Sequence, residues 1–294
     1  MNENTAYINK MTLGQKLAAY KRRPGSFIMF LLTWLAAIIT AAVVVIIVAY
    51  ILIKGIPNLK PSLFALEYNS ENVSMLPAII NTVTMTLLSL ALAVPIGVFS
   101  AIYLAEYAKR GNPLVKVVRV TTETLSGIPS IVYGLFGYLI FVIACRFGLS
   151  MLSGALTLAI MILPTMMRTT EEALLSVPDS FREGSFGLGA GRLRTVFRVV
   201  LPSAVPGILS GIILSIGRIV GETAALIYTS GTVAGIPQDL MHSGRTLSIH
   251  MYALLSEGLY MEEAYATAVV LLVMVLVINM LSGVIAKRLS AKKG

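Results

Sequence analysis

The sequence predicts an all-α protein, a polytopic membrane bundle of six transmembrane helices with both termini in the cytoplasm. Only 13% of its 294 residues are charged and 56% are hydrophobic, with a mean hydropathy of +0.84. A soluble domain carries about a quarter charged residues, because its surface must be solvated. The chain also contains several apolar runs of the length that crosses the hydrocarbon core of a bilayer. These two observations exclude an ordinary soluble domain.

Six segments are long enough, and poor enough in charge, to be membrane spans. Pro95 is expected to bend the second of them, and only Arg146 separates the third from the fourth. The fifth contains two charged residues, Arg218 and Glu222. The predicted spans are residues 27–53, 75–105, 125–145, 147–167, 199–227 and 264–286.

Basic residues are distributed unevenly between the two sides of these spans. The first tail, the connections after spans two and four, and the last tail together hold 18 lysines and arginines, against five on the opposite side when Arg218 of the fifth span is included. The positive-inside rule therefore places both tails in the cytoplasm. The chain is therefore expected to consist of a cytoplasmic tail 1–25, a transmembrane domain 26–288 with a cytoplasmic loop 168–198 and an acidic outer loop 229–263, and a cytoplasmic tail 289–294.

This charge pattern also bears on the kind of partner. The net charge of +9 could suggest nucleic acid. However, the basic residues lie beside apolar runs rather than in one stripe that could follow a phosphate backbone. We therefore expect membrane lipid, and no nucleic acid, around this chain.

The connection between spans four and five predicts a helical hairpin in the cytoplasm. Ser180 followed by Glu183 has the spacing of a capping box, which would open a first helix. Gly187, Gly189 and Gly191 then interrupt any helix, so the chain is expected to turn there. A second helix is expected from about residue 192.

This hairpin resembles a loop of the ABC importer permeases. That loop reads Glu-Ala-Ala, three residues, Gly, nine residues, and Ile-x-Leu-Pro. The same spacing is found here, with glycine and serine in place of the two alanines, at Glu183, Gly184, Ser185, Gly189, Leu201 and Pro202.

In that family the loop is the coupling helix, which docks on the ATPase subunit. The resemblance implies that these six residues couple the chain to a dimer of ABC ATPase subunits, with Glu183 alternatively a helix cap alone. No Gly-x-x-x-x-Gly-Lys-Ser/Thr motif occurs in the sequence, so we expect no ATP hydrolysis, cofactor or catalytic residue in this chain.

Three further stretches, 127–137, 168–174 and 206–223, resemble the phosphate-specific branch of that family, and the Arg-Thr-Thr-Glu sequence is closer to its PstA type of permease. The resemblance implies inorganic phosphate as the substrate. It also implies two further partners, a second homologous permease and an extracytoplasmic phosphate-binding protein. A permease for another small oxyanion is the alternative within the family.

Charged residues inside the predicted spans are candidates for the substrate pathway. Arg218 lies in an apolar run with Glu222 one helical turn later, and Arg168 follows Pro164 near the end of span four. Intramembrane charges are costly and usually face a cavity or a partner. Arginine also presents a planar fork of donors suited to phosphate oxygens. We therefore assign Arg218, Glu222 and Arg168 to the pathway.

Each of these assignments has a structural alternative. Arg218 and Glu222 could form an ion pair that only fixes helix packing, and Arg168 could simply end its span. Gly127 and Pro129 could break a helix or start one, and we expect a helix start.

Two other classes of function fit the sequence less well. A secondary anion transporter or channel would need coupling-ion ligands or paired broken helices, and neither pattern is visible. A membrane enzyme would rely on His242 and His250 near Asp239, which lack metal-ligand spacing. We expect these histidines to be solvated loop residues and predict no metal site.

Overall fold

The structure is a computed structural model in which residues 24–109 and 111–291 are described. Most of the predicted tails, 1–25 and 289–294, therefore lie outside the described residues. The described residues form helices and no strands, which confirms the all-α prediction. The α-helices are α2 (Pro24–Gly55), α3 (Leu76–Ile102), α4 (Pro113–Ser126), α5 (Ser130–Gly137), α6 (Met151–Leu175), α7 (Asp179–Gly187), α8 (Arg192–Thr195), α9 (Leu201–Val220), α10 (Ala224–Thr229), α11 (Leu247–Glu257) and α12 (Met261–Ala291).

Three of the spans are extended by π-helical turns and one is followed by short 3₁₀ turns. The π segments are Tyr103–Tyr107 after α3, Tyr138–Ala144 after α5 and Val196–Val200 before α9. The 3₁₀ turns are Ile56–Asn58 and Pro61–Phe64.

The chain divides into two units, and the first is essentially α2 (residues up to Ile53). α2 carries no charged residue between Phe27 and Ile53, and most of its apolar side chains are exposed. A helix of this length with apolar surface on all sides is suited to a lipid environment. The predicted first span is confirmed.

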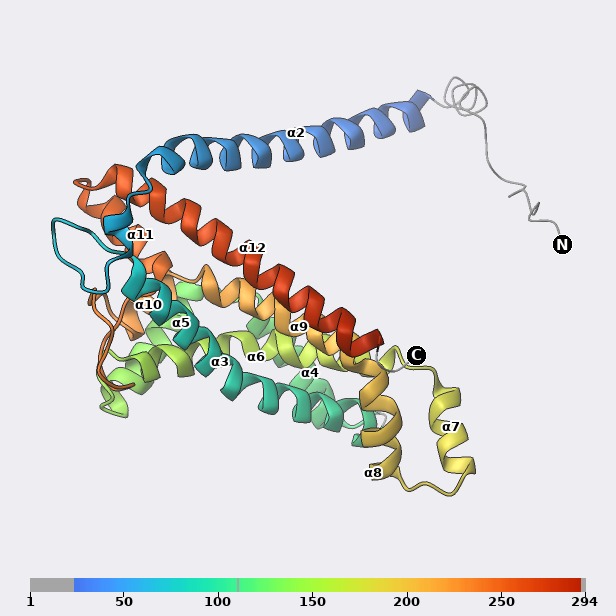
Figure 1. The fold of residues 1–294 in the computed structure, drawn as a ribbon. Coiled ribbons are helices and arrows are strands. Elements are labelled where there is room, and N and C mark those ends of the chain that lie inside the picture. The colour runs from blue at the N-terminus through green and yellow to red at the C-terminus, as the bar shows by residue number, and fades with distance from the viewer. Residues whose placement is uncertain (1–23, 110, 292–294) are drawn as a thin grey trace. The chain divides into compact units, whose positions relative to one another are not determined.

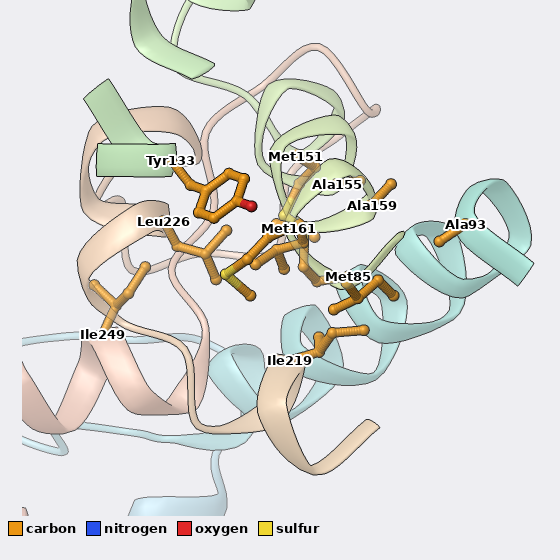
Figure 2. Packing of buried hydrophobic residues seen from close by; sticks show 12 residues of the cluster. Met85, Ala93, Tyr133, Met151, Ala155, Ala159, Met161, Ile219, Leu226 and Ile249 are labelled. Carbon is orange, nitrogen blue, oxygen red and sulfur yellow. The ribbon is translucent and has the colours of Figure 1, made fainter. Parts of the chain in front are cut away.

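The second unit begins at Lys54, and α6 lies at the centre of its core. α6 packs on α3 and on α9, and α9 in turn packs on α12 (Figure 1). Figure 2 shows the apolar side chains that fill the space between these elements, among them Met161 of α6, Met85 of α3 and Ile219 of α9. Tyr133 of α5 closes this core and donates its hydroxyl to the carbonyl of Leu125 at 2.8 Å.

Five helices of the described chain are long and apolar enough to cross a membrane: Gly25–Asn58, Leu76–Tyr107, Met151–Leu175, Arg192–Val220 and Met261–Val284. A sixth span results if the bent pair Pro113–Ser126 and Ser130–Ala144 is counted as one.

The third span is not the straight run that we expected. α5 does begin directly after Pro129, but α4 precedes it and the two helices meet at 106°. Pro129 lacks an amide proton and restricts the residue before it, so α4 cannot continue through this point. The Gly127–Pro129 segment is therefore both a helix start and a helix break. Gly134 of α5 then approaches α10 so closely that a Cβ there would lie 2.8 Å from the Cα of Ala225.

The two ends of the second unit differ in construction (Figure 1). α7 and α8 form the predicted hairpin at one end, and Gly189 between them has a φ of +80°, as a tight turn requires. The capping box is wrong, because α7 already begins at Asp179 and Pro178 precedes it without a side-chain cap. Ser180 is thus inside the helix. Asp179, the acidic first residue of α7, stabilises the helix start through the helix dipole instead.

The opposite end is built from α10, α11 and the segment 230–246 (Figure 1). The predicted outer loop therefore contains a helix, α11, which packs on α12 and α3. The expectation that both histidines are solvated is wrong for His250, whose side chain in α11 is fully buried. It holds for His242, which is exposed and contacts Asp239 at 2.6 Å.

Candidate functional site

Arg218 lies in the last turn of α9, and the two residues that follow it show which face of the helix is buried. Ile219 and Val220 are buried, 2% and 1% exposed, so they turn that face of α9 into the protein. Arg218 is only partly buried and lines a cavity of about 490 Å³. It is the one charged residue among the described residues lining this cavity, which are Thr165, Ile213, Leu214, Gly217, Arg218 and Asn279.

The side chains around this cavity suit a small oxyanion. The guanidinium of Arg218, the amide of Asn279 on α12 and the hydroxyl of Thr165 on α6 can all donate hydrogen bonds. Within the described chain no ion pair neutralises Arg218. The arrangement can therefore offer a positive charge and three kinds of donor to a ligand.

Glu222 does not lie on the same helix face as Arg218, which corrects the sequence prediction. α9 ends at Val220, so Glu222 falls in the break before α10. Its Oε1 accepts a hydrogen bond from the amide of Ala225 at 3.1 Å, and its carbonyl accepts one from Ser248 at 2.6 Å. The proposed structural ion pair is wrong because the helix on which its spacing relied stops too early.

Arg168 is placed differently from Arg218. α6 continues for about two turns beyond it, so Arg168 does not end the helix. Its side chain is exposed and pairs with Glu172 at 2.9 Å. It lines a cavity of about 300 Å³ in which Arg119 pairs with Glu171, with Nε and Oε1 2.8 Å apart. The cations of this cavity are already paired with carboxylates.

Arg168 and Arg218 lie at different distances from the end of the second unit that carries the hairpin. Thr165 lines the cavity of Arg218, whereas a Cβ on Gly211 would meet the side chain of Thr169. Gly211 is seven residues before Arg218 in α9, a distance of about 10 Å along a helix. Arg168 therefore lies closer than Arg218 to the end that carries the hairpin.

The residues assigned to coupling lie in the hairpin and at the start of α9, which follows it. Glu183 and Gly184 are exposed in the middle of α7. Ser185 lies 2.8 Å from the hydroxyl of Thr195 in α8, which joins the two helices, and Gly189 forms the turn between them. Leu201 and Pro202 lie outside the hairpin, in the first turn of α9.

A clamp between the hairpin and α3 was missed by the sequence reasoning. Arg182 of α7 binds Glu106 at 2.6 Å, and it also donates to the carbonyls of Leu174 and Val177 at 2.9 and 2.7 Å. The contact with Glu106 raises the pKa of Arg182 above its ordinary value. Both charged side chains are largely buried, 14% and 8% exposed.

Arg192 of α8 reinforces this clamp. It donates to the backbone carbonyl of Glu106 and lies over the ring of Tyr107, 5.1 Å from its centroid. Both helices of the hairpin are therefore bound to the π segment that ends α3.

The end opposite the hairpin holds no candidate metal centre in the described part of the chain. The hydrogen bond from His242 lowers the pKa of Asp239, and the two side chains form an exposed pair.

Residues 93–293 match the model of the family described as "Binding-protein-dependent transport system inner membrane component". The "Probable ABC transporter permease protein YqgI" of Bacillus subtilis is 33% identical over 87% of this chain and 95% of its own length. The "Phosphate transport system permease protein PstA" of Pasteurella multocida is 37% identical over 77% of this chain and 81% of its own.

The fold has solved counterparts as well. A bacterial ABC transporter involved in the import of alginate matches with a TM-score of 0.64 at 18% identity, over 93% of this chain and 99% of that one. The MetNI methionine ABC transporter matches with a TM-score of 0.58 at 20% identity, over 72% and 93%. The helical architecture is that of the type I importer permeases. The chain therefore belongs to the family of binding-protein-dependent transport system inner membrane components, the permease subunits of ABC importers.

Proposed function

We propose that this chain is a permease subunit that carries inorganic phosphate into the cell, past Arg218. The observation that carries the proposal is the unpaired Arg218 in a cavity with Thr165 and Asn279. Several relatives named as PstA phosphate permeases, at 32–37% identity, point to the same substrate. Both termini are cytoplasmic in this proposal, as the distribution of basic residues predicts.

The partners follow from the proposed role. The exposed face of α7 presents Phe181, Phe186 and the turn residue Leu188, which are 49%, 47% and 91% exposed. Exposed apolar residues of this kind mark a docking surface, here for an ABC ATPase that hydrolyses ATP in place of this chain. A second homologous permease and an extracytoplasmic phosphate-binding protein complete the assembly.

Arg218 and Arg168 have different roles in this proposal. Arg218 supplies an uncommitted charge to the anion, whereas Arg168 offers a weaker, carboxylate-paired contact nearer the hairpin. A charge that is already paired attracts an anion less, which favours onward movement and release. Glu222 holds the start of α10 rather than contacting the anion.

Substitution of Arg218 tests the proposal. Arg218→Gln should reduce ATP-dependent phosphate uptake about 10- to 100-fold, as expected for one hydrogen bond to a charged group. Glu222→Gln keeps an oxygen for the amide of Ala225 and should transport normally. Arg146→Gln, at an exposed arginine, is the matched control.

The double variant separates pathway from scaffold. Because no ion pair joins the two residues in the described chain, Arg218→Gln with Glu222→Gln should be as defective as Arg218→Gln alone. Recovery of near-normal uptake in the double variant, at equal expression, would show that Arg218 only balances Glu222.

A further inference from the structure

A second arginine without a counter-charge lies at the end opposite the hairpin. Arg245 is 5% exposed, and its Nε and Nη2 make no hydrogen bond in the described part of the chain. No ion pair reaches it from the described carboxylates either. A buried guanidinium is costly unless it is paired, so an orphaned one indicates a missing ion.

The surroundings hold Arg245 in one orientation. Its backbone amide donates to the carbonyl of Val233 at 2.9 Å, and its carbonyl accepts a hydrogen bond from Asn81 of α3 at 3.1 Å. The guanidinium carbon lies over the ring of Tyr68, 4.5 Å from the centroid. The ring therefore covers one flat face of the guanidinium, while Nε and Nη2 at its edge have no partner in the described part of the chain.

The two free nitrogens indicate which kind of ligand fits. Nε and Nη2 form one edge of the guanidinium, with two parallel donors spaced to bind two oxygens of one anion. Phosphate and sulfate have such oxygen pairs, whereas a halide has none. Arg245 also lies two residues before α11, whose N-terminus adds positive partial charge.

His250 of α11 borders the same cluster. Its ring lies edge to face with that of Tyr68, at 6.2 Å between centroids, and neither ring nitrogen makes a well-formed hydrogen bond in the described chain. Burial and the charge of Arg245 lower the pKa of His250 to about 3, although the nearby backbone of Val73 opposes the shift. The imidazole is therefore neutral at physiological pH and offers one N–H donor without a second charge.

Glu222 does not neutralise this cluster. Ser248 ties the Glu222 carbonyl to α11, but the Glu222 carboxylate is directed to the amide of Ala225.

We propose that the Nε–Nη2 edge of Arg245, bordered by Tyr68 and His250, is a binding site for a small oxyanion, separate from the cavity of Arg218. That the natural occupant is phosphate rests on the proposed function.

Counting the bound anions tests this site. The transporter is purified with its partner subunits and carries Arg218→Gln, so that binding at Arg218 does not contribute. Equilibrium dialysis with labelled inorganic phosphate should show that adding Arg245→Gln removes one bound phosphate per copy of this chain. Arg146→Gln in the same background, at an exposed arginine, should remove none.

A second measurement does not depend on counting. In chloride buffer without phosphate, sulfate or carboxylate anions, Arg245→Gln should raise the unfolding midpoint, because it removes an uncompensated buried charge. Phosphate or sulfate should raise the midpoint of the Arg218→Gln protein, increasingly with concentration, and chloride at equal ionic strength should not. If Arg245→Gln fails to assemble, Arg245→Lys should keep the charge but weaken phosphate binding, because it lacks the two-donor edge.

Unchanged phosphate stoichiometry in the Arg245 variants would overturn the proposal, as would chloride stabilisation equal to that of phosphate. These outcomes are separable from the fate of the proposed function. Normal phosphate uptake with unchanged stoichiometry would remove the Arg245 site alone. Loss of one bound phosphate in a transporter that imports no phosphate would leave the site standing and remove the function.

Discussion

Three arginines of this permease show how the surroundings of one residue type decide its role. Arg182 is bound to a carboxylate and two carbonyls, and Arg168 is bound to a carboxylate at the surface. Arg218 has no such partner in the described chain and lines a cavity. A guanidinium whose donors are committed holds structure together, whereas one with free donors can bind an anion. The role assigned to each residue follows from its partners rather than from its depth.

His250 allows a prediction for pH dependence. Its pKa of about 3 lies below the ordinary 6.5, so between these values the unfolded chain binds a proton that the folded chain does not. Its contribution to stability is therefore complete above about pH 6.5 and is lost as the pH falls toward 3. Between pH 6.5 and about 4.5, the unfolding midpoint should fall less steeply for His250→Phe than for the unchanged chain.

The exposed histidine provides the control. His242→Gln should keep the steeper dependence of the unchanged chain, since its ring is 59% exposed. Identical slopes for His250→Phe and the unchanged chain would show that His250 is not buried as a neutral group.

The sequence indicated the role of a single residue only where a charged side chain stood among apolar ones. Arg218 stands out because it interrupts an apolar run, and the structure places it beside a cavity. The pairing with Glu222 failed because one residue, Gly221, ends the helix between them. His250 was misjudged because only metal-ligand spacing was considered. The apolar residues around it, Leu247, Ile249 and Leu254, could have indicated a buried helix.

At the scale of elements, the clamp of Glu106 and Arg182 connects the hairpin to a membrane span. Glu106 belongs to the π segment that prolongs α3, and Arg182 lies near the start of α7. Movement imposed on α7 by an ATPase would therefore reach α3 directly through this ion pair, and would also reach α9 along the chain. The clamp is a positioning device, since neither residue lies in the cavity of Arg218.

Arg182→Met is predicted to uncouple transport from ATP hydrolysis. The substitution leaves Glu106 buried without its cation, and breaking a buried pair in this way costs about 3–5 kcal/mol. Phosphate uptake should fall while membrane insertion persists, and proteolysis near Gly189 should become faster. Arg194→Met, at an exposed arginine of α8, should leave both measurements unchanged.

The rescue by a second substitution identifies the mechanism. Glu106→Gln combined with Arg182→Met removes the uncompensated charge and should restore part of the uptake. Normal coupling in Arg182→Met alone would mean that the hairpin does not act through α3.

The hairpin was predictable in outline, and its attachment was not. The glycines at 187, 189 and 191 mark the turn because a left-handed residue is needed there, as the φ of Gly189 confirms. The clamp joins residues 76 positions apart, and no local pattern indicates such a contact. The bend of 106° falls at Gly127 and Pro129, where the sequence allowed a helix break, but the charged residues of α4 hid the helix that precedes it.

For the whole molecule, the distribution of polarity explains how much could be foreseen. Long apolar runs indicate the membrane helices, and three of the six predicted spans correspond to single membrane-length helices that begin and end within a few residues of the expected places: α2, α3 with its π segment, and α12. The fourth, α6, begins at Met151 and continues to Leu175, beyond the predicted end at residue 167. The fifth begins earlier, at Arg192, and stops at Val220. Packing between spans is set by small residues such as Gly211 and Gly134, whose partners depend on the tertiary fold.

The most direct test of the account is ATP-dependent uptake by the complete transporter. The chain would be reconstituted in vesicles with the partner permease, the ATPase and the binding protein, and labelled phosphate would be followed with and without ATP. We predict accumulation that requires ATP and all subunits and that persists in excess sulfate. Accumulation of a different substrate in place of phosphate, or phosphate uptake driven by an ion gradient without ATP, would contradict the account.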